Sequence, residues 1–351
     1  MKLINKIIIG IFFLLLFAIA ITNVKEFSDY ASEYIDKRIE IKNEVISENE
    51  KIEYYNVYKY EKLAKEFNNY DQALLYAKSQ IRSYITKKDK NTWLWDNFDK
   101  YIVFSQETYI NDYASFEEAY RNAKILKYGI IYYENTNKLI WERNSIVSNK
   151  VKLDVKVINQ YPELPRGCEV TSLSMLLSSQ NINVDKMILA KEVNKSNHKY
   201  KDIDGSDIIG NPNEGFVGDM YSLKKYGYGV YHNPVYELFK KYSGDNAVDI
   251  SELEFEDFYY FIDRGAPVWV ITNTTFKKLG KKKYKVININ GEEIIVTSKE
   301  HSVIVTGYDD ENVYINDPLK LQNNIKVNKE DFIESWEQMG KQAITYIKTT
   351  N

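Results

Sequence analysis

An uncharged apolar run near the N-terminus is the first pattern along the chain. Residues 7–24 carry no charge and follow Lys2 and Lys6. Positive charge before such a run is typical of a secretory signal or a signal anchor, and it directs the rest of the chain out of the cytoplasm. The run is close to the lower limit for spanning a bilayer. We expect a signal peptide or signal anchor over 1–24. A small-x-small site allows cleavage near Ala20, but continuing apolar residues favour a retained anchor.

A second pattern is a repeat with an offset of 46 residues, which follows a polar, helical linker over 25–52. Gap-free similarity at a fixed offset indicates copies of one structural unit. We therefore predict two repeat modules, 53–98 and 99–144. The matched pairs include Tyr55 and Tyr101, Val57 and Val103, Phe67 and Tyr113, Ala73 and Ala119, Lys78 and Lys124, and Trp95 and Trp141.

Each predicted module has the same internal order. Two short strands precede an amphipathic helix, whose N-cap is expected at Asn69 or Ser115, and two further strands follow. This order describes a small α+β module. Its aromatic residues either bind the cell envelope or a partner protein, or fill two small cores. Strand and helix periodicity favours the cores.

The third pattern begins at the single cysteine. Apolar residues recur at helical spacing after Glu169, and two prolines are expected to keep residues 161–166 extended. Cys168 is therefore predicted at a helix N-terminus, where the helix dipole stabilises a thiolate. Glu169 is expected to face solvent or to cap the first turn. The helical positions on one face are Val170, Leu173, Leu176 and Leu177.

Net charge and cysteine content narrow the classes of function that the chain could have. The 351 residues carry a net charge of −3, which gives nucleic-acid binding no electrostatic support. One cysteine cannot form an intrachain disulfide, so Cys168 is a free reactive thiol, a site of intermolecular pairing or a buried inert thiol.

A base for this thiol is predicted at His301, which begins a strand-like run, whereas His198 and His232 lie in polar turns and are interpreted as surface residues. A turn centred on Asp309 pairs His301 directly with Asp317 across a hairpin. That placement would let the carboxylate orient the imidazole. The pairing could also be an ordinary structural one, and a register slip of one residue would bring Asn316 into this position instead.

An oxyanion donor is expected on the segment before the cysteine. Gln160 lies eight residues before Cys168, and its side-chain amide could join the Cys168 backbone N–H in stabilising a tetrahedral oxyanion. Asn159 is the alternative donor.

These stretches resemble the C39-like peptidase family of bacterial secreted and membrane-anchored proteins. The similar segments include 160–177, 215–219, 225–230, 265–270, 300–310, 316–319 and 332–343, in the order of the family. The resemblance implies a papain-like fold over 150–351, in which a helix bearing the cysteine packs on an antiparallel sheet bearing the histidine and aspartate. It implies a triad of Cys168, His301 and Asp317, with Gln160 as oxyanion donor.

The expected function is thus an extracytoplasmic cysteine peptidase of α+β fold that acts on a peptide or protein substrate and needs no cofactor or metal. Two alternatives stay open. One is a catalytically silent papain-like scaffold whose tandem modules bind the cell envelope or a partner protein. The other is a cell-wall amidase or transpeptidase that uses the same triad.

Overall fold

The computed structural model describes residues 37, 53–60, 62–88, 92–133, 138–143, 145, 147–202 and 204–348. The predicted signal or anchor over 1–24 lies outside the described residues, and so does the predicted linker, apart from Lys37. Within the described part of the chain, no helix is both long and apolar enough to cross a membrane. The chain divides into two compact units, Met1–Trp95 and Asp96–Asn351.

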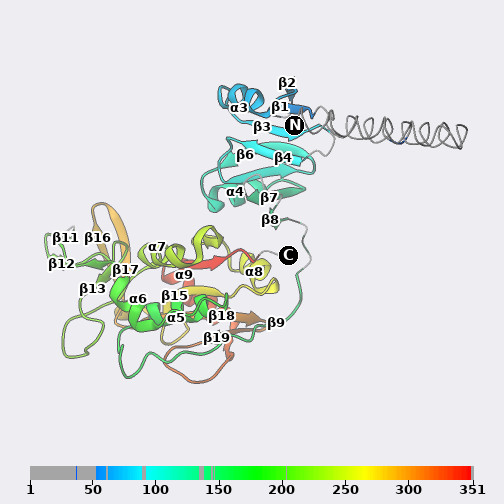
Figure 1. Cartoon of the computed structure of the whole chain (residues 1–351). Coiled ribbons are helices and arrows are strands. Elements are labelled where there is room, and N and C mark those ends of the chain that lie inside the picture. The colour runs from blue at the N-terminus through cyan, green and yellow to red at the C-terminus, as the bar shows by residue number, and fades with distance from the viewer. Residues whose placement is uncertain are drawn as a thin grey trace, which may run out of the picture. The chain divides into compact units, whose positions relative to one another are not determined.

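The described strands of the first unit form an antiparallel sheet, and helix α3 lies against it (Figure 1). The strand order is β2-β1-β3-β4, and the N-cap residue of α3 is Asn69, as predicted, since its side chain accepts a hydrogen bond from the Gln72 backbone N–H. The core is small and includes Val57, Ala73 and Ile85. The bounds are β1 Tyr55–Lys59, β2 Lys62–Phe67, α3 Tyr70–Lys78, β3 Ser83–Lys87 and β4 Thr92–Asp96.

The second unit begins with a sheet of the same strand order, β6-β5-β7-β8. Ser115 caps its helix by accepting a hydrogen bond from the Glu118 backbone N–H, again as predicted. The strands of this sheet lie 46 residues after those of the first, and both sheets have an irregularity at the equivalent point of their first strand pair. The bounds are β5 Tyr101–Ser105, β6 Thr108–Tyr113, α4 Phe116–Ala123, β7 Gly129–Tyr133 and β8 Lys138–Glu142.

The C-terminal domain, which we define as residues 150–348, is built on a seven-stranded sheet (Figure 1). Its order is β14-β21-β15-β18-β19-β20, and β9 also pairs with β18. Every residue of β15 is buried, as expected for a strand covered on both faces. The bounds are β9 Val151–Lys152, β14 Ala247–Asp249, β15 Val268–Asn273, β18 Glu300–Tyr308, β19 Asn312–Asn316, β20 Ile325–Asn328 and β21 Ala343–Tyr346.

Helices and three small two-stranded sheets complete the described part of this domain. The helices are α5 Cys168–Ser178, α6 Lys186–Glu192, α7 His232–Ser243, α8 Phe258–Asp263 and α9 Lys329–Gln338. The small sheets pair β10 Lys195–Ser196 with β13 Phe216–Val217, β11 Lys199–Lys201 with β12 Asp207–Ile209, and β16 Lys285–Ile289 with β17 Glu292–Val296. Short 3-10 helices span Gly244–Asn246, Phe255–Asp257 and Lys281–Lys283.

Helix α5 is the central helix of the domain. Its residues from Cys168 to Leu177 are all buried, which is typical of a helix enclosed by other elements. It contacts β15 and β18 of the sheet and the helices α6 and α7. The first residue of this helix is therefore brought close to the first residues of β18.

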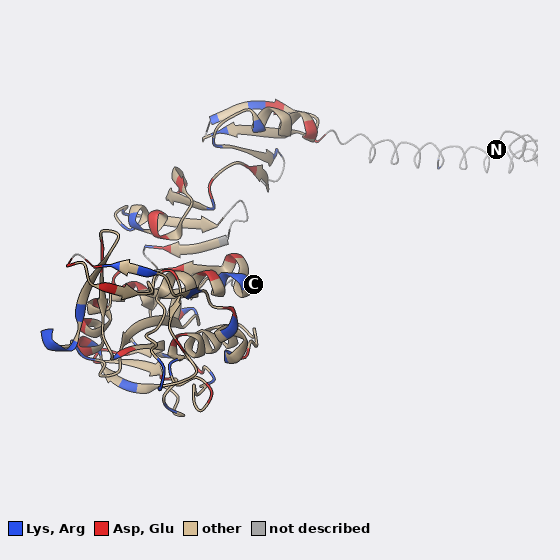
Figure 2. Cartoon of the chain, turned by 90° about the vertical axis from the view of Figure 1, so that its left-hand side faces the viewer, with Lys and Arg blue, Asp and Glu red and all other residues tan. Residues whose placement is uncertain are grey.

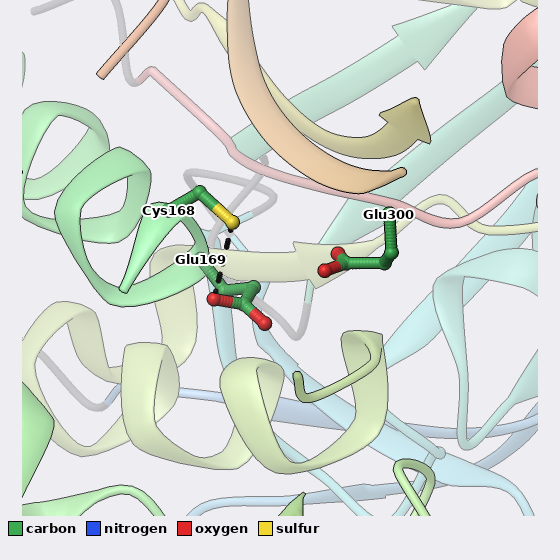
Figure 3. Close-up of side chains that lie close together, drawn as sticks. All are labelled: Cys168, Glu169 and Glu300. Atoms are coloured by element: carbon green, nitrogen blue, oxygen red, sulfur yellow. Dashed lines mark hydrogen bonds between the residues drawn. The ribbon is translucent and has the colours of Figure 1, made fainter. Parts of the chain in front are cut away.

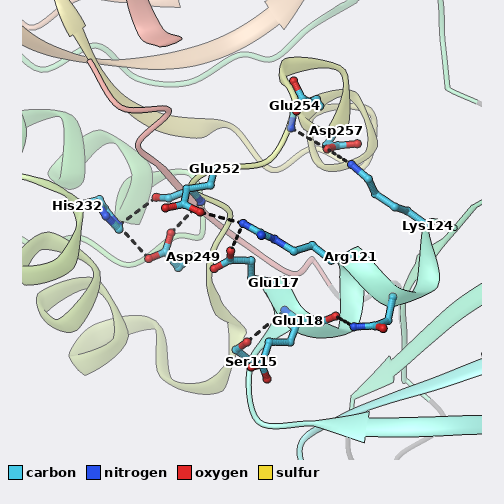
Figure 4. Close-up of polar contacts among 12 residues, drawn as sticks. Ser115, Glu117, Glu118, Arg121, Lys124, His232, Asp249, Glu252, Glu254 and Asp257 are labelled. Carbon is cyan, nitrogen blue, oxygen red and sulfur yellow. Dashed lines mark hydrogen bonds and ion pairs between the residues drawn. The ribbon is translucent and has the colours of Figure 1, made fainter. Parts of the chain in front are cut away.

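Helix α4 packs on the C-terminal domain within the second unit. The rings of Phe116 and Phe261 lie 5.8 Å apart between centroids, and Phe116 is 2% exposed. Polar contacts join the same two parts: the Tyr120 hydroxyl donates to Asp257, and Arg121 pairs with Glu252 at 2.8 Å (Figure 4). In the Arg121–Glu252 ion pair, α4 supplies the basic residue. Basic and acidic residues are interspersed along the rest of the described chain (Figure 2).

We predict that the aromatic contact carries most of the stability of this interface. Phe116→Ala should lower the free energy of unfolding by about 3–5 kcal/mol, because it leaves a cavity in a closed core. Arg121→Ala should cost less than about 1 kcal/mol, because its ion pairs are exposed to solvent. Urea unfolding followed by tryptophan fluorescence measures both. Equal losses for the two variants would contradict this account.

Candidate active site

Cys168 is the first residue of α5, as predicted, and Gly167 is its N-cap. A Cβ on Gly167 would lie 2.6 Å from Leu164 Cβ, so a glycine is needed for this close turn into the helix. The preceding segment is not extended, contrary to our expectation. It forms consecutive turns in which Leu164 N–H donates to Gln160 O and Gly167 N–H donates to Leu164 O, each at 3.0 Å. Buried Leu164 anchors these turns to the core.

His301 and Asp317 are in direct contact. His301 lies on β18 and Asp317 directly follows β19, and the Nε2 and Oδ1 atoms are 2.8 Å apart. Both residues are almost fully buried. Burial disfavours the carboxylate of Asp317, but the hydrogen bond and charge of His301 outweigh this effect and lower the pKa of Asp317. The imidazole therefore has Nδ1 left for a second partner.

The hairpin register differs from the predicted one. Tyr308 pairs with Val313, and after an irregularity Val305 pairs with Ile315. The predicted direct pairing of His301 with Asp317 was therefore wrong. The observed register is displaced by two residues from the predicted one, so Asp317 lies diagonally across from His301. A shift of two residues keeps side chains on the same face of a sheet, so the contact survives. Asn316 turns elsewhere, since its Nδ2 donates to Val155 O at 2.7 Å.

The Cys168 thiol does not hydrogen-bond to His301 in this structure. Its Sγ lies 3.3 Å from Glu169 Oε2, and the Ser302 backbone also hydrogen-bonds to the sulfur. Burial raises the pKa of the thiol well above its usual value, and the nearby Glu169 and Glu300 carboxyl groups raise it further. Our expectation that the helix N-terminus would leave a depressed thiol pKa was therefore wrong for this arrangement.

Glu169 and Glu300 are site residues that the sequence reasoning missed. Glu169 is fully buried rather than solvent-facing, and it points toward Cys168 and Glu300 (Figure 3). Burial raises the pKa of Glu169 to about 7, and burial together with the Glu169 charge raises the pKa of Glu300 well above its usual value. The available signal was their position, because one directly follows the cysteine and the other directly precedes the histidine.

The three groups are also close enough to consider a metal ion. One ligand atom from each of Cys168, Glu169 and Glu300 lies within 4.8 Å of the others. However, both carboxylate oxygens of Glu169 already accept hydrogen bonds within the protein, Oε1 from Val230 N–H at 2.8 Å and Oε2 from the thiol. We therefore assign no metal to this cluster.

Gln160 is buried next to the site, but its amide is engaged. Nε2 donates to Leu164 O and to Pro165 O, each at 3.1 Å, while Oε1 is buried and has no hydrogen-bond partner in the described part of the chain. Its backbone N–H donates to Pro318 O at 2.9 Å, which ties this segment to the residue after Asp317. The alternative donor, Asn159, uses its side-chain oxygen to accept from Tyr161 N–H.

The other two histidines lie in different environments. His198 is exposed. His232 begins α7, and its Nδ1 lies 2.9 Å from Asp249 Oδ2 and 3.0 Å from Ser251 Oγ. Ser251 Oγ also bonds to the backbone of Ala343, so this group connects α7, β14 and β21 and is interpreted as structural.

Comparison with known proteins identifies relatives of the C-terminal part. Residues 152–344 match the Peptidase_C39 like family. A Bacillus subtilis (strain 168) protein, YvpB, described as uncharacterized, is 42% identical over 199 residues, which are 56% of this chain and 76% of that protein. A crystal structure of a Bacillus anthracis protein assigned to the C39-like peptidases is 46% identical, with a TM-score of 0.54, and covers 58% of this chain and all of that one.

Gly229 should prove intolerant to substitution. A Cβ there would lie 2.6 Å from Glu169 Oε1 and 2.8 Å from Glu300 Oε2. Gly229→Ala should therefore displace the carboxyl pair and lower the free energy of unfolding by about 1–3 kcal/mol. Gly280→Ala is the matched control, because nothing lies within 4 Å of its Cβ position. Similar unfolding midpoints for the two variants would show that a side chain at position 229 does not displace the carboxyl groups.

The Asp317–His301 pair should give a defined pH dependence of stability. Because folding lowers the pKa of Asp317, its contribution is present above the unfolded value of about 3.9 and is lost as the pH falls through the folded pKa. Asp317→Asn should therefore weaken the loss of stability below about pH 4. Asp317→Ala should cost about 1–3 kcal/mol at pH 7, because it leaves a buried imidazole N–H unpaired. Urea unfolding at pH 7 and pH 3 measures both effects, and parallel pH profiles for wild type and Asp317→Asn would argue against them.

Proposed function

The chain belongs to the Peptidase_C39 like family, and from this premise we propose that residues 150–351 form a papain-like cysteine peptidase domain. The observation that carries the proposal is the buried His301–Asp317 pair, with Nε2 and Oδ1 2.8 Å apart. His301 lies on β18, the strand that contacts the helix beginning with the only cysteine. A nucleophile, a base and an orienting carboxylate are the groups that acyl transfer requires.

In the proposed reaction, Cys168 gives its proton to Nδ1 of His301, and the thiolate attacks the carbonyl carbon of a peptide bond. The C–S bond forms, and the imidazolium returns the proton to the leaving amine as the C–N bond breaks. Water then gives a proton to His301 and attacks the thioester carbonyl. The C–O bond forms, the C–S bond breaks to release the acid, and the imidazolium returns its proton to the Cys168 thiolate. Asp317 holds the imidazole through Nε2 in the required tautomer throughout.

The developing oxyanion needs donors near Cys168. The backbone N–H of Cys168, the first of its helix, is one candidate, because the first amides of a helix have no partner within it. The Gln160 amide is the second, and it would have to release one of its two carbonyl partners to take this role.

We also propose an extracytoplasmic setting. The support is the sequence of residues 1–24, which would either anchor the chain in the membrane or be cleaved near Ala20. The two sheets before the catalytic domain would be copies of one repeat module that binds the cell envelope or a partner protein. Their common strand order supports this, and so do the exposed Leu63, Leu75 and Ile81 of the first copy.

A second candidate function is a catalytically silent scaffold. The observation that favours it is the Cys168 thiol, which bonds to Glu169 rather than to His301 and has a raised pKa.

Digestion of a peptide library by the purified full-length chain separates the two functions. We expect defined cleavage sites by mass spectrometry, and we expect Cys168→Ala and His301→Ala to reduce the rate by about a thousandfold or more. Arg121→Ala is the control, since its side chain contacts α4 and Glu252 rather than the site. If no peptide is cleaved, or if Cys168→Ala cleaves like wild type, the scaffold is the better description.

A further inference from the structure

Two carboxyl groups lie against the candidate nucleophile without a role in the triad. Glu169 Oε2 is 3.3 Å from Cys168 Sγ, and an oxygen of Glu300 lies within 4.8 Å of both groups (Figure 3). Gly229 closes the space beside the two carboxyl groups. Two ionised carboxylates this close in a buried site would repel each other strongly, so one is expected to hold a proton.

The hydrogen bonds distinguish the two groups. Glu169 accepts from Val230 N–H at 2.8 Å and from the thiol, and both bonds stabilise a negative charge. Glu300 Oε1 is buried and has no partner among the described residues. An unsolvated oxygen is a poor place for a charge, so the proton is better placed on Glu300.

We propose that Glu300 carries the proton and Glu169 the negative charge of this pair, and that Glu169 holds Cys168 as a neutral resting thiol until its own charge is neutralised. Glu169 is thus a positioning residue, which acts through the nucleophile. The proposal rests on the proposed function, because it concerns when the same cysteine becomes competent. To react, the thiol must give up its hydrogen bond to Glu169 Oε2 and donate to Nδ1 of His301 instead.

The other titratable and charged groups around the pair are consistent with this assignment. Lys195 on β10 interacts with Glu169, and its ammonium favours the charged carboxylate. Tyr228 and Tyr231 approach Glu300 from the segment before α7, and burial raises the pKa of both phenols, so they stay neutral. His301 follows Glu300 on β18, and its imidazole is paired with Asp317.

A pH window follows from this arrangement. The pKa of Glu169 is raised to about 7 by burial, so its carboxyl group is neutral below that pH and charged above it. Above about pH 7 the charged carboxylate opposes the thiolate. Below it the like charge beside the sulfur disappears, and transfer of the thiol proton to His301 becomes easier.

The rate of iodoacetamide alkylation of the full-length chain from pH 5 to 9 tests the proposal, since Cys168 is the only thiol. Glu169→Gln removes the charge but keeps an oxygen that can accept from the thiol. We expect it to alkylate about tenfold faster than wild type at pH 7.5, the change that a thiol pKa lower by about one produces. The inflection near pH 7 in the wild-type profile should also disappear.

Glu300→Gln is the discriminating variant. Because Glu300 is already neutral in our assignment, its alkylation rate at pH 7.5 should stay within about twofold of wild type. Glu330→Gln, an exposed site on α9, is the matched control and should leave the whole profile unchanged. If Glu169→Gln does not fold, Glu169→Asp withdraws the charge from the sulfur and should give a smaller acceleration.

An unchanged profile in the folded Glu169 variant overturns the proposal. So does a Glu300→Gln variant that accelerates as much as Glu169→Gln, because the charge would then lie on Glu300. These outcomes are separate from failure of the proposed function. A chain that cleaves no peptide can still show the predicted alkylation pattern, and an active peptidase can lack it.

Discussion

The first two turns of α5 are fixed against the central sheet by two buried hydrogen bonds, and the geometry of the site depends on them. Trp269 Nε1 on β15 donates to Glu169 O at 3.0 Å, and Ser172 Oγ donates to Ser302 O at the same distance. The first amides of a helix have no partner within it, so the helix itself does not fix its orientation relative to the sheet. These bonds set Cys168 against the start of β18, next to the backbone that carries Glu300 and His301.

The same constraint explains why the thiol is not activated by its helix alone. A helix N-terminus stabilises an anion by about 0.3–1 kcal/mol, or about 2 kcal/mol in favourable buried geometries. Two like unit charges 4 Å apart repel by about 4 kcal/mol at an effective dielectric constant of 20. The Glu169 carboxylate lies at 3.3 Å, so its charge outweighs the helix dipole. Reactivity here is therefore set by which buried group holds a proton.

Local patterns predicted the elements well, and tertiary detail explains what they missed. Short-range signals placed the caps at Asn69 and Ser115 and the start of α5, because a cap depends on neighbours within four residues. The hairpin register failed because Asp309 accepts hydrogen bonds from Glu311 N–H and from Asn312 N–H, which closes a four-residue turn and keeps Tyr308 in the strand. A side-chain contact within the turn cannot be read from strand periodicity.

The prediction for Glu169 was wrong for a different reason. A carboxylate directly after a helix-starting residue is normally a solvent-facing cap, and that preference is a property of the isolated helix. Here the Val230 backbone N–H comes from a segment 61 residues away and supplies the donor that makes burial tolerable. The same segment contributes Gly229, whose lack of a side chain leaves room for both carboxyl groups. Burial of the acid beside the nucleophile is thus a consequence of how the 227–231 segment closes over α5, which the sequence around Cys168 does not encode.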